Sequence, residues 1–199
     1  MILLLARLGV GCLKVIDYDV FDETNLNRQA LSDLNAIGQS KSDKAVSQVG
    51  SINPGVRVEA FQVQIDYQRS LEIFKGVDVV VDALDNIPDR FVVEKSAKTL
   101  QIPLVHGAIA GFDGQLMTIF PEDEGLKSLY GDGEVEKNDP ARPGAVLGVP
   151  ALTPSLIATM QAMEVVKIVL NRGNLFRNKL LHIDIESGQF NQFSFGKEE

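Results

Sequence analysis

The stretch VDVVVDAL, from Val77 to Leu84, decides the fold class. It is almost continuous in apolar and β-branched residues, which is typical of a strand buried on both faces of a parallel sheet. We therefore predict a strand over residues 77–84. Asp85 and Asn86 follow directly, where the carboxyl end of that strand is expected.

Strand-like runs and helical patterns alternate on both sides of this stretch. The helical patterns are each bounded by Gly, Pro or Asn signals. Alternation of this kind predicts a parallel α/β sheet. The other strand candidates are Leu13–Tyr18, Val56–Val63 and Pro103–Ala108, and the helical patterns are Lys41–Val49, Gln68–Lys75 and Asp89–Leu100.

After Gly114 the pattern changes. A further apolar run, Gln115–Phe120, precedes a stretch at about 121–144 that is rich in Asp, Glu, Gly and Pro. We expect that stretch to be a mobile crossover loop. A helix over about Thr153–Leu170 should follow, and then a hairpin of Lys179–Ile185 and Gln189–Phe195.

The apolar segment from Ala145 to Leu170 raises the question of a membrane span. It is interrupted by prolines and by polar or charged residues, including Gln161, Glu164 and Lys167, which a bilayer would leave uncompensated. We expect a core helix and no membrane partner. The initial Met-Ile-Leu-Leu-Leu has no basic region before it, so we interpret it as a helix fragment.

Charge and cysteine content exclude several functions. The 199 residues carry a formal net charge of -8 without a Lys/Arg-rich run, which disfavours nucleic acid as a partner. Cys12 is the single cysteine, so neither an internal disulfide nor a zinc cluster of cysteines can form. We expect a reducing, cytoplasmic location, with Cys12 packed between a helix and a strand.

The glycines Gly9 and Gly11 suggest a phosphate-binding loop, but their context is wrong. They lie between a helical pattern and a strand, whereas a dinucleotide fingerprint follows a strand and opens a helix. We predict instead that Gly9 ends the first helix in a left-handed conformation.

Two acidic residues stand at predicted strand ends. Open α/β sheets bind ligands beyond the carboxyl ends of their strands, and Asp17 and Asp85 both fall there. Asp85-Asn86 before Ile87-Pro88 could equally form a turn and a helix cap. The loop acids Asp19 and Asp22 are expected to be hydrated, and the two histidines, His106 and His182, to be structural.

Several short motifs occur in a fixed order: Asp17-Tyr18-Asp19, Asn25-Leu26-Asn27-Arg28-Gln29, Gly38-Gln39-Ser40-Lys41, Ile52-Asn53-Pro54, Asp82 with Asp85-Asn86 and Arg90, and Gln161-Ala162-Met163-Glu164. In these motifs the chain resembles the ThiF/MoeB/HesA family, which is similar to the adenylation domain of ubiquitin-activating enzymes. The resemblance implies a Rossmann-like, doubly wound and mainly parallel α/β sheet, followed by the C-terminal helix and hairpin. It places residues 1–199 in one adenylation domain.

The resemblance also implies an activity. The enzyme would use ATP and Mg²⁺ to adenylate the C-terminal glycine of a small ubiquitin-like or sulfur-carrier protein, and it would act as a homodimer. By the same resemblance the site residues are Asp17 for the ribose, Arg28 and Lys41 for the phosphates, Asn25 and Gln29 as support for the phosphate loop, and Asp85 for the magnesium ion.

The chain departs from the family pattern in two places. Many relatives bind zinc through Cys-x-x-Cys pairs, whereas Glu124–Leu129 stands where the first pair would occur, so no zinc is expected. A ribose-binding acid lies roughly 20 residues after the glycine fingerprint. If Asp17 is that acid, the fingerprint would precede Met1, and we expect the domain to be incomplete at its N-terminus.

Two other functions stay open at this point. A truncated relative could serve as a dimerisation or carrier-binding module without adenylating anything. An NAD-dependent oxidoreductase would share the ribose acid, but it would give Arg28 and Lys41 no role. The sequence does not choose between carriers of thiamine, molybdenum cofactor or other pathways.

Overall fold

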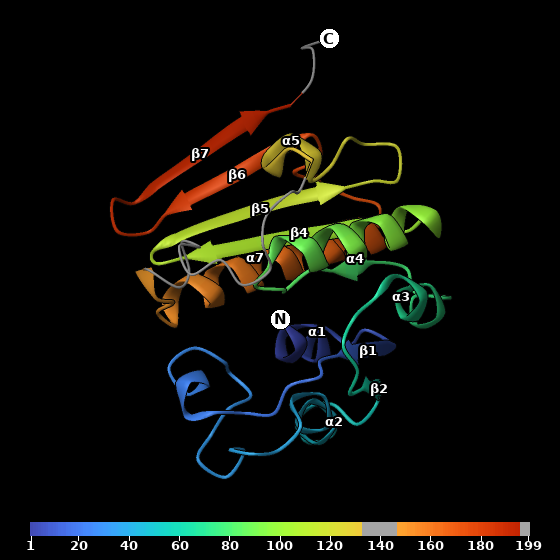
Figure 1. Cartoon of the computed structure of the whole chain (residues 1–199), viewed down its shortest axis with the longest axis vertical. Coiled ribbons are helices and arrows are strands. Elements are labelled where there is room, and N and C mark those ends of the chain that lie inside the picture. The colour runs from blue at the N-terminus through green and yellow to red at the C-terminus, as the bar shows by residue number, and fades with distance from the viewer. Residues whose placement is uncertain (133–146, 196–199) are drawn as a thin grey trace. The chain divides into compact units, whose positions relative to one another are not determined.

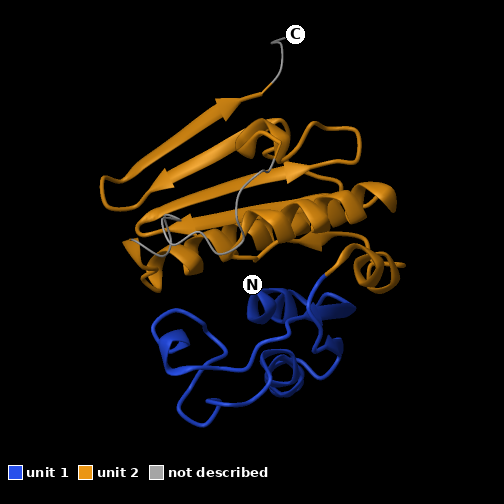
Figure 2. Ribbon diagram, viewed as in Figure 1, with its two compact units in different colours: residues 1–65 blue, residues 66–199 orange. Residues whose placement is uncertain are grey.

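The computed structural model describes residues 1–132 and 147–195. Its contacts divide the chain into two compact units, residues 1–65 (unit 1) and residues 66–199 (unit 2), which Figure 2 colours separately. Each unit has its own sheet, so we describe each by itself.

Unit 1 holds a helix–strand–helix–strand arrangement with a long connection in its middle (Figure 1). Strands β1 and β2 pair in parallel, with Cys12 opposite Arg57 and Ile16 opposite Phe61. Buried Ala6, Val49 and Val56 form the core beneath them. The elements of unit 1 are α1 (Ile2–Leu8), β1 (Cys12–Ile16), the 3-10 helix η1 (Glu23–Asn25), α2 (Lys41–Ile52) and β2 (Arg57–Phe61).

The end of α1 is as predicted. Gly9 has φ 76° and ψ 35°, and its N–H donates to the carbonyl of Ala6. This left-handed conformation favours glycine, since a side chain would strain it. The prediction that Gly9 terminates a helix is confirmed, and the chain turns there into β1.

Unit 2 is built on a five-stranded sheet in the order β3-β4-β5-β6-β7. Helix α7 runs along β4 and β5 (Figure 1). The elements are α3 (Tyr67–Ile73), β3 (Val80–Val81), α4 (Ile87–Thr99), β4 (Leu104–Ala110), β5 (Asp113–Ile119), α5 (Lys127–Tyr130), α7 (Leu152–Val169), β6 (Lys179–Asp184) and β7 (Gln189–Ser194).

The α/β class is confirmed, with one correction to the direction of pairing. The parallel pairs are β1–β2 and β3–β4, as the alternating pattern predicts. From β4 onward the neighbours are antiparallel. Tight turns reverse the chain between β4 and β5 and between β6 and β7, whereas parallel pairing needs a crossover. The direction of the β5–β6 pair depends instead on which distant strands become neighbours in the sheet.

The strand predicted over residues 77–84 is shorter than expected. Only Val80–Val81 has strand geometry, and the ladder to β4 extends to the Asp82 N–H, which donates to the Val105 carbonyl at 3.0 Å. Among the described strands of unit 2, β3 is the end strand and pairs with β4 alone. A strand persists only where a partner takes its hydrogen bonds, so the apolar run by itself overestimates its length.

Helix α7 is the one described helix that is long and apolar enough to cross a membrane. Its length and composition are weak evidence, because the core helix of a globular domain has the same features. Ile157 and Val165 are buried, and buried Gln161 and Glu164 form hydrogen bonds within unit 2. These contacts support the core helix that the sequence predicts.

The expected crossover loop at about 121–144 lies partly outside the described residues. Its described part, residues 121–132, contains the short helix α5. Lys98 Nζ on α4 donates to the carbonyls of Asp123 and Glu124, at 2.7 and 3.1 Å, so the start of the crossover is attached to α4.

Candidate functional site

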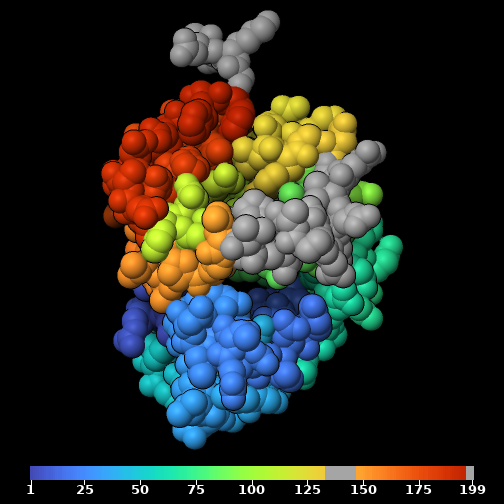
Figure 3. Space-filling view, turned by 60° about the vertical axis from the view of Figure 1, so that its left-hand side comes forward, coloured from blue at the N-terminus to red at the C-terminus, as the bar shows by residue number. Residues whose placement is uncertain are grey.

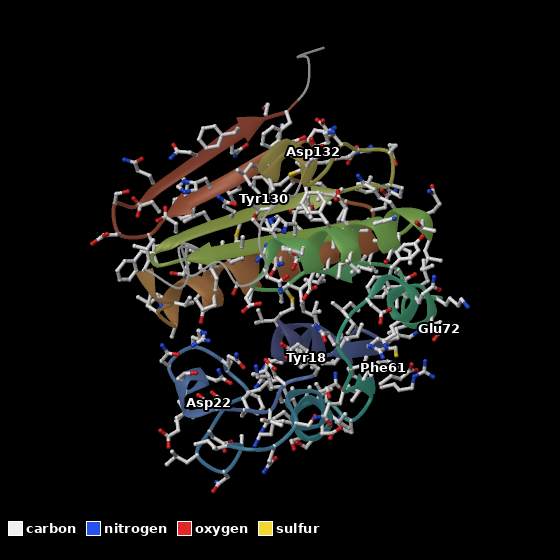
Figure 4. The ribbon with its side chains drawn as sticks, in the orientation of Figure 1. Tyr18, Asp22, Phe61, Glu72, Tyr130 and Asp132 are labelled. Carbon is white, nitrogen blue, oxygen red and sulfur yellow. The ribbon has the colours of Figure 1, made fainter. Side chains whose placement is uncertain are left out.

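Asp17 lies directly after β1, as predicted. Its N–H donates to the Phe61 carbonyl of β2 at 3.2 Å, which fixes the backbone where the strand ends. Its Oδ1 accepts from the Asp19 N–H at 2.9 Å. The carboxylate is therefore oriented by the loop that follows it, next to the exposed Tyr18 labelled in Figure 4.

Lys41 is the first residue of α2 and is tied to the same loop. Its Nζ lies 3.0 Å from Asp19 Oδ2, and its N–H donates to the Asp19 carbonyl at 3.0 Å. The Asp19 N–H donates to Asp17, and the Asp19 carboxylate accepts from Lys41. Asp19 therefore links two predicted site residues that are 24 positions apart in the sequence. Asp19 is thus a partner of the ammonium, and the expectation of a merely hydrated loop acid is wrong.

Asn25 is buried and closes the turn at η1. Its Oδ1 accepts from the Asp22 N–H at 3.1 Å, while the Asp22 carboxylate accepts from the Thr24 N–H at 2.8 Å. This reciprocal pair is a capping box. It also explains why the pKa of Asp22 is lowered, chiefly by the hydrogen bond from the Thr24 backbone.

Gln29 contributes to the same loop through its backbone groups. Its N–H donates to the Asn25 carbonyl at 2.9 Å, and its own carbonyl accepts from Ser32 Oγ at 2.6 Å. Asn25 and Gln29 therefore shape the loop between β1 and α2. In Figure 3 this loop, in shades of blue, covers a broad part of the face shown by unit 1.

Arg28 lies on the same loop and is half-buried. Its Nη1 donates to the Thr24 carbonyl at 2.6 Å and to Asn27 Oδ1 at 3.0 Å. Both bonds are donated by the same guanidinium nitrogen, Nη1. They orient the planar fork before any ligand is bound.

Asp85 belongs to unit 2, and the structure places it at the exposed turn between β3 and α4. The Asn86 amide lies 3.4 Å from Asp85 Oδ1, and Asn86 Oδ1 accepts from the Asp89 N–H at 2.9 Å. The capping role that the sequence left open therefore falls to Asn86, the N-cap of α4. Asp85 stands one residue before the cap.

A buried cluster of polar side chains lies next to this turn, and sequence reasoning missed it. It consists of Asp82, Arg90, His106 and Tyr130. His106 Nδ1 lies 2.6 Å from Asp82 Oδ2, Arg90 Nη1 lies 3.4 Å from the same oxygen, and His106 Nε2 lies 3.2 Å from Tyr130 Oη. Tyr130, labelled in Figure 4, belongs to α5.

The charges of the buried cluster follow from its surroundings. Burial alone raises the pKa of Asp82, but Arg90 and the His106 hydrogen bond hold that pKa below its ordinary value. Burial lowers the pKa of His106 although Asp82 opposes it, and burial raises the pKa of Tyr130. Near neutral pH, Asp82 is thus ionised and paired with Arg90, while His106 is neutral.

This charge state assigns the histidine tautomer. An ionised carboxylate only accepts, so His106 Nδ1 carries the proton and donates to Asp82. Nε2 is then the acceptor for the Tyr130 hydroxyl.

A sequence signal existed: Asp82 and Arg90 flank apolar runs, and charges buried there need partners.

Cys12 differs from the prediction. It is exposed, not packed, because it is the first residue of β1 at the margin of the β1–β2 pair. Its Sγ lies 3.4 Å from Arg57 Nε, and the other predicted structural side chain, His182, lies 3.0 Å from Asp113 Oδ1. Within residues 1–132 and 147–195, no group of three or more His, Cys, Asp or Glu side chains could hold a metal ion.

A recess in unit 2 is lined by none of the predicted site residues. It has a volume of about 520 Å³ and is lined by Phe120, by residues 173–177, and by Lys179 and Gln192. It is open and contains none of the residues implicated in nucleotide chemistry. We therefore describe two separate sets of candidate residues, the loop residues of unit 1 and the β3–α4 turn of unit 2.

The parallel βα elements, with polar residues at their carboxyl ends, define a Rossmann-like α/β protein. The chain belongs to the ThiF family, whose model matches residues 1–199. It is similar to SAMP-activating enzyme E1 of Haloferax volcanii, with 36% identity over 180 residues covering 90% of this chain and 66% of the relative. It is also similar to a sulfur carrier protein adenylyltransferase of Thermus thermophilus, at 34% identity covering 96% and 72%.

Solved structures agree on the fold. E. coli MccB with ATP superposes with a TM-score of 0.78 at 19% identity, covering 98% of this chain and 60% of that one. PaaA gives a TM-score of 0.78 at 21% identity, covering 99% and 60%. The chain thus spans about three fifths of these structures and between 41% and 72% of the length of several curated relatives.

Proposed function

We propose that the protein adenylates the C-terminal glycine carboxylate of a small ubiquitin-like or sulfur-carrier protein, with ATP as co-substrate. The observation that carries this proposal is the chain Asp17–Asp19–Lys41, which joins a strand-end carboxylate to a cation at a helix N-terminus. Family membership and the names of the Haloferax and Thermus relatives support it.

The proposed reaction needs positive charge at the phosphates. The carrier carboxylate attacks the α-phosphate, a new C–O–P linkage forms, and the bond to the leaving pyrophosphate breaks. Both partners are anionic, so positioned cations lower the barrier. Arg28 supplies a planar fork and Lys41 a compact ammonium.

The contacts of these cations suit such a role. An ammonium has three donors, so Lys41 can contact a phosphate oxygen while it keeps Asp19. Arg28 Nη1 is held by its own loop, and a bidentate grip on phosphate would use the opposite edge, Nε and Nη2. Asp17 would hold the ribose hydroxyls, with Asn25 and Gln29 keeping the loop in shape.

Asp85 suits a magnesium ion in its donor chemistry. Mg²⁺ is usually bound by one or two carboxylates, and phosphates and waters complete its shell, so a single exposed aspartate is sufficient. When bound, the ion would neutralise charge on the phosphates. The role of Asp85 in this proposal is to hold it.

The test is ATP–pyrophosphate exchange by the full-length gene product with a candidate carrier. Arg28→Ala and Lys41→Ala are each expected to lower the rate by about 100-fold, the typical loss when one transition-state donor is removed. Lys44→Ala is the matched control. Lys44 lies one turn further along α2 and pairs with Asp33 at 3.0 Å, with a side chain 12% exposed against 13% for Lys41.

Each outcome has a clear meaning. A loss in the first two variants with near wild-type exchange in Lys44→Ala supports the assignment. Unchanged exchange in both Arg28→Ala and Lys41→Ala contradicts it, whatever the control does.

We extend the proposal to assembly and environment. We propose a homodimer without zinc in a reducing cytoplasm. The exposed apolar residues Leu152, Met163 and Val169 on α7 support a dimer. The single cysteine supports a zinc-free protein in a reducing environment. Light scattering that gives the mass of one chain, and not twice that mass, would contradict the dimer.

A further inference from the structure

The buried cluster in unit 2 has no part in the phosphate chemistry proposed above. The side chains of Asp82 and His106 are 0% exposed and that of Arg90 is 7% exposed. They connect the end of β3, helix α4 and strand β4. Their most specific contacts are with one residue of the β3–α4 turn.

Both backbone polar groups of Leu84 are held by the buried cluster. Asp82 Oδ1 accepts from the Leu84 N–H at 2.8 Å, and Arg90 Nη2 donates to the Leu84 carbonyl. That carbonyl belongs to the peptide bond leading into Asp85. On the other side of Asp85, Asn86 is fixed as the N-cap of α4.

A lysine cannot replace Arg90 in this arrangement, because the contacts of Arg90 need two separate nitrogens. Nη1 donates to the Gly107 carbonyl of β4 at 3.0 Å and faces Asp82 Oδ2, while Nη2 donates to Leu84. A lysine ammonium would have to reach all three oxygens from one atom. The fork therefore sets the distance between the turn and β4.

The remaining members orient Asp82. His106 Nδ1 forms a hydrogen bond with Asp82 Oδ2, and the other carboxylate oxygen, Oδ1, accepts from the Leu84 N–H. The Tyr130 hydroxyl forms a hydrogen bond with Nε2 of the same imidazole. A buried ion pair is costly to desolvate and gives little net stability compared with apolar packing. Its presence here is better explained by the specific contacts that it makes.

We propose that Arg90 and Asp82 are positioning residues for Asp85, and that they fix the turn so that its carboxylate is presented for the metal–nucleotide complex. His106 and Tyr130 support them from the opposite side. This inference rests on the proposed adenylation, and it adds buried residues that would act through Asp85.

The central variant is Arg90→Lys, which keeps the charge and loses the fork. Removing a group that orients a metal ligand typically costs 10–100-fold in metal affinity or activity. We expect the Mg²⁺ concentration for half-maximal pyrophosphate exchange to rise about 10-fold, with much of the rate recovered at saturating Mg²⁺. Hydrogen exchange of the Leu84 amide, measured without nucleotide, should accelerate in the same variant.

Thr118→Val is the matched control. It removes a buried 2.6 Å hydrogen bond to Glu164 elsewhere in unit 2. It should lower thermal stability and leave the Mg²⁺ dependence as in the wild type. A shift in both variants would mean that any destabilisation of unit 2 has this effect, and it would overturn the positioning role.

The outcomes separate this inference from the proposed function. If the wild type exchanges and Arg90→Lys shows an unchanged Mg²⁺ dependence, positioning is wrong and adenylation stands. If the wild type never exchanges, adenylation fails, and the Leu84 amide still reports whether Arg90 fixes the turn. Should Arg90→Lys not fold, Tyr130→Phe is expected to shift the Mg²⁺ dependence in the same direction by a smaller factor, and no shift would overturn the inference.

Discussion

His106 is fully buried beside Asp82, and this position links the stability of the protein to pH. Burial lowers the pKa of His106, so the folded state stays neutral at a pH where an unfolded chain binds a proton, near 6.5. Asp82 contributes to the pH dependence of stability at a lower pH than His106 does. Its pKa is lowered in the fold by Arg90 and His106, which outweigh burial, so the unfolded chain holds that proton more tightly.

Both shifts predict lower stability on acidification. The unfolded state binds more protons than the folded state below about pH 6.5 for His106, and below about pH 4 for Asp82. One proton changes stability by at most about 1.4 kcal/mol per pH unit. We expect the free energy of unfolding in urea to fall by roughly 1 kcal/mol between about pH 6.5 and 5.5.

The comparison of two histidine variants assigns the effect. His106→Asn should flatten the dependence over this pH range, and His182→Asn, which retains the buried imidazole, should preserve it. A wild-type stability that is constant or that rises as the pH falls through this range would contradict the charge state assigned to the cluster.

At the scale of elements, Arg177 ties the segment before β6 to the segment after β5. Its Nε lies 3.1 and 3.0 Å from the two oxygens of Asp123, and its Nη2 lies 2.8 Å from Oδ1. Asp123 Oδ2 also accepts from the Phe120 N–H at 2.8 Å. The Asp123 side chain is only 3% exposed, so it depends on these donors.

Arg177→Ala is expected to lower the free energy of unfolding by about 2 kcal/mol in urea titrations, because it leaves a buried carboxylate partly unpaired. The loss is below the roughly 3–5 kcal/mol of a fully buried pair since the Arg177 side chain is 36% exposed. Lys127→Ala breaks the exposed pair with Asp132 and should leave the free energy of unfolding close to the wild-type value, because exposed ion pairs contribute little. Equal effects of the two substitutions would contradict this account.

The sequence predicts most elements because their signals are local. Apolar periodicity and caps place α2, α4, α7 and the β6–β7 hairpin within a few residues of their observed bounds. The length of β3 and the antiparallel direction after β4 depend on which strands become neighbours. Neighbours are a tertiary property, so an apolar run alone does not specify them.

The candidate site divides in the same way. Polar residue types at strand ends are enough to single out Asp17 and Asp85 from the amino-acid sequence. The contacts that orient them join residues distant in sequence, such as Asp19 to Lys41 and Asp82 to His106. Sequence spacing does not reveal such pairs, so it predicts a hydrated Asp19 and, although it predicts a structural His106, it does not identify the partners of that side chain.

At the scale of the whole molecule, the proposed reaction draws on both units. The residues proposed for ribose and phosphates belong to unit 1, whereas Asp85 and its positioning residues belong to unit 2. The ThiF family model matches residues 1–199 and so includes residues of both units.

The most direct test of the central claim is carrier-dependent ATP–pyrophosphate exchange by the full-length gene product. The substrate is a small ubiquitin-like carrier protein that ends in glycine, and the same carrier with an amidated C-terminus is the control. We predict exchange with the free carboxylate only, together with a carrier species heavier by one AMP in mass spectrometry. Exchange that ignores the carrier, or no exchange and no carrier–AMP with any glycine-ended carrier, would contradict the account.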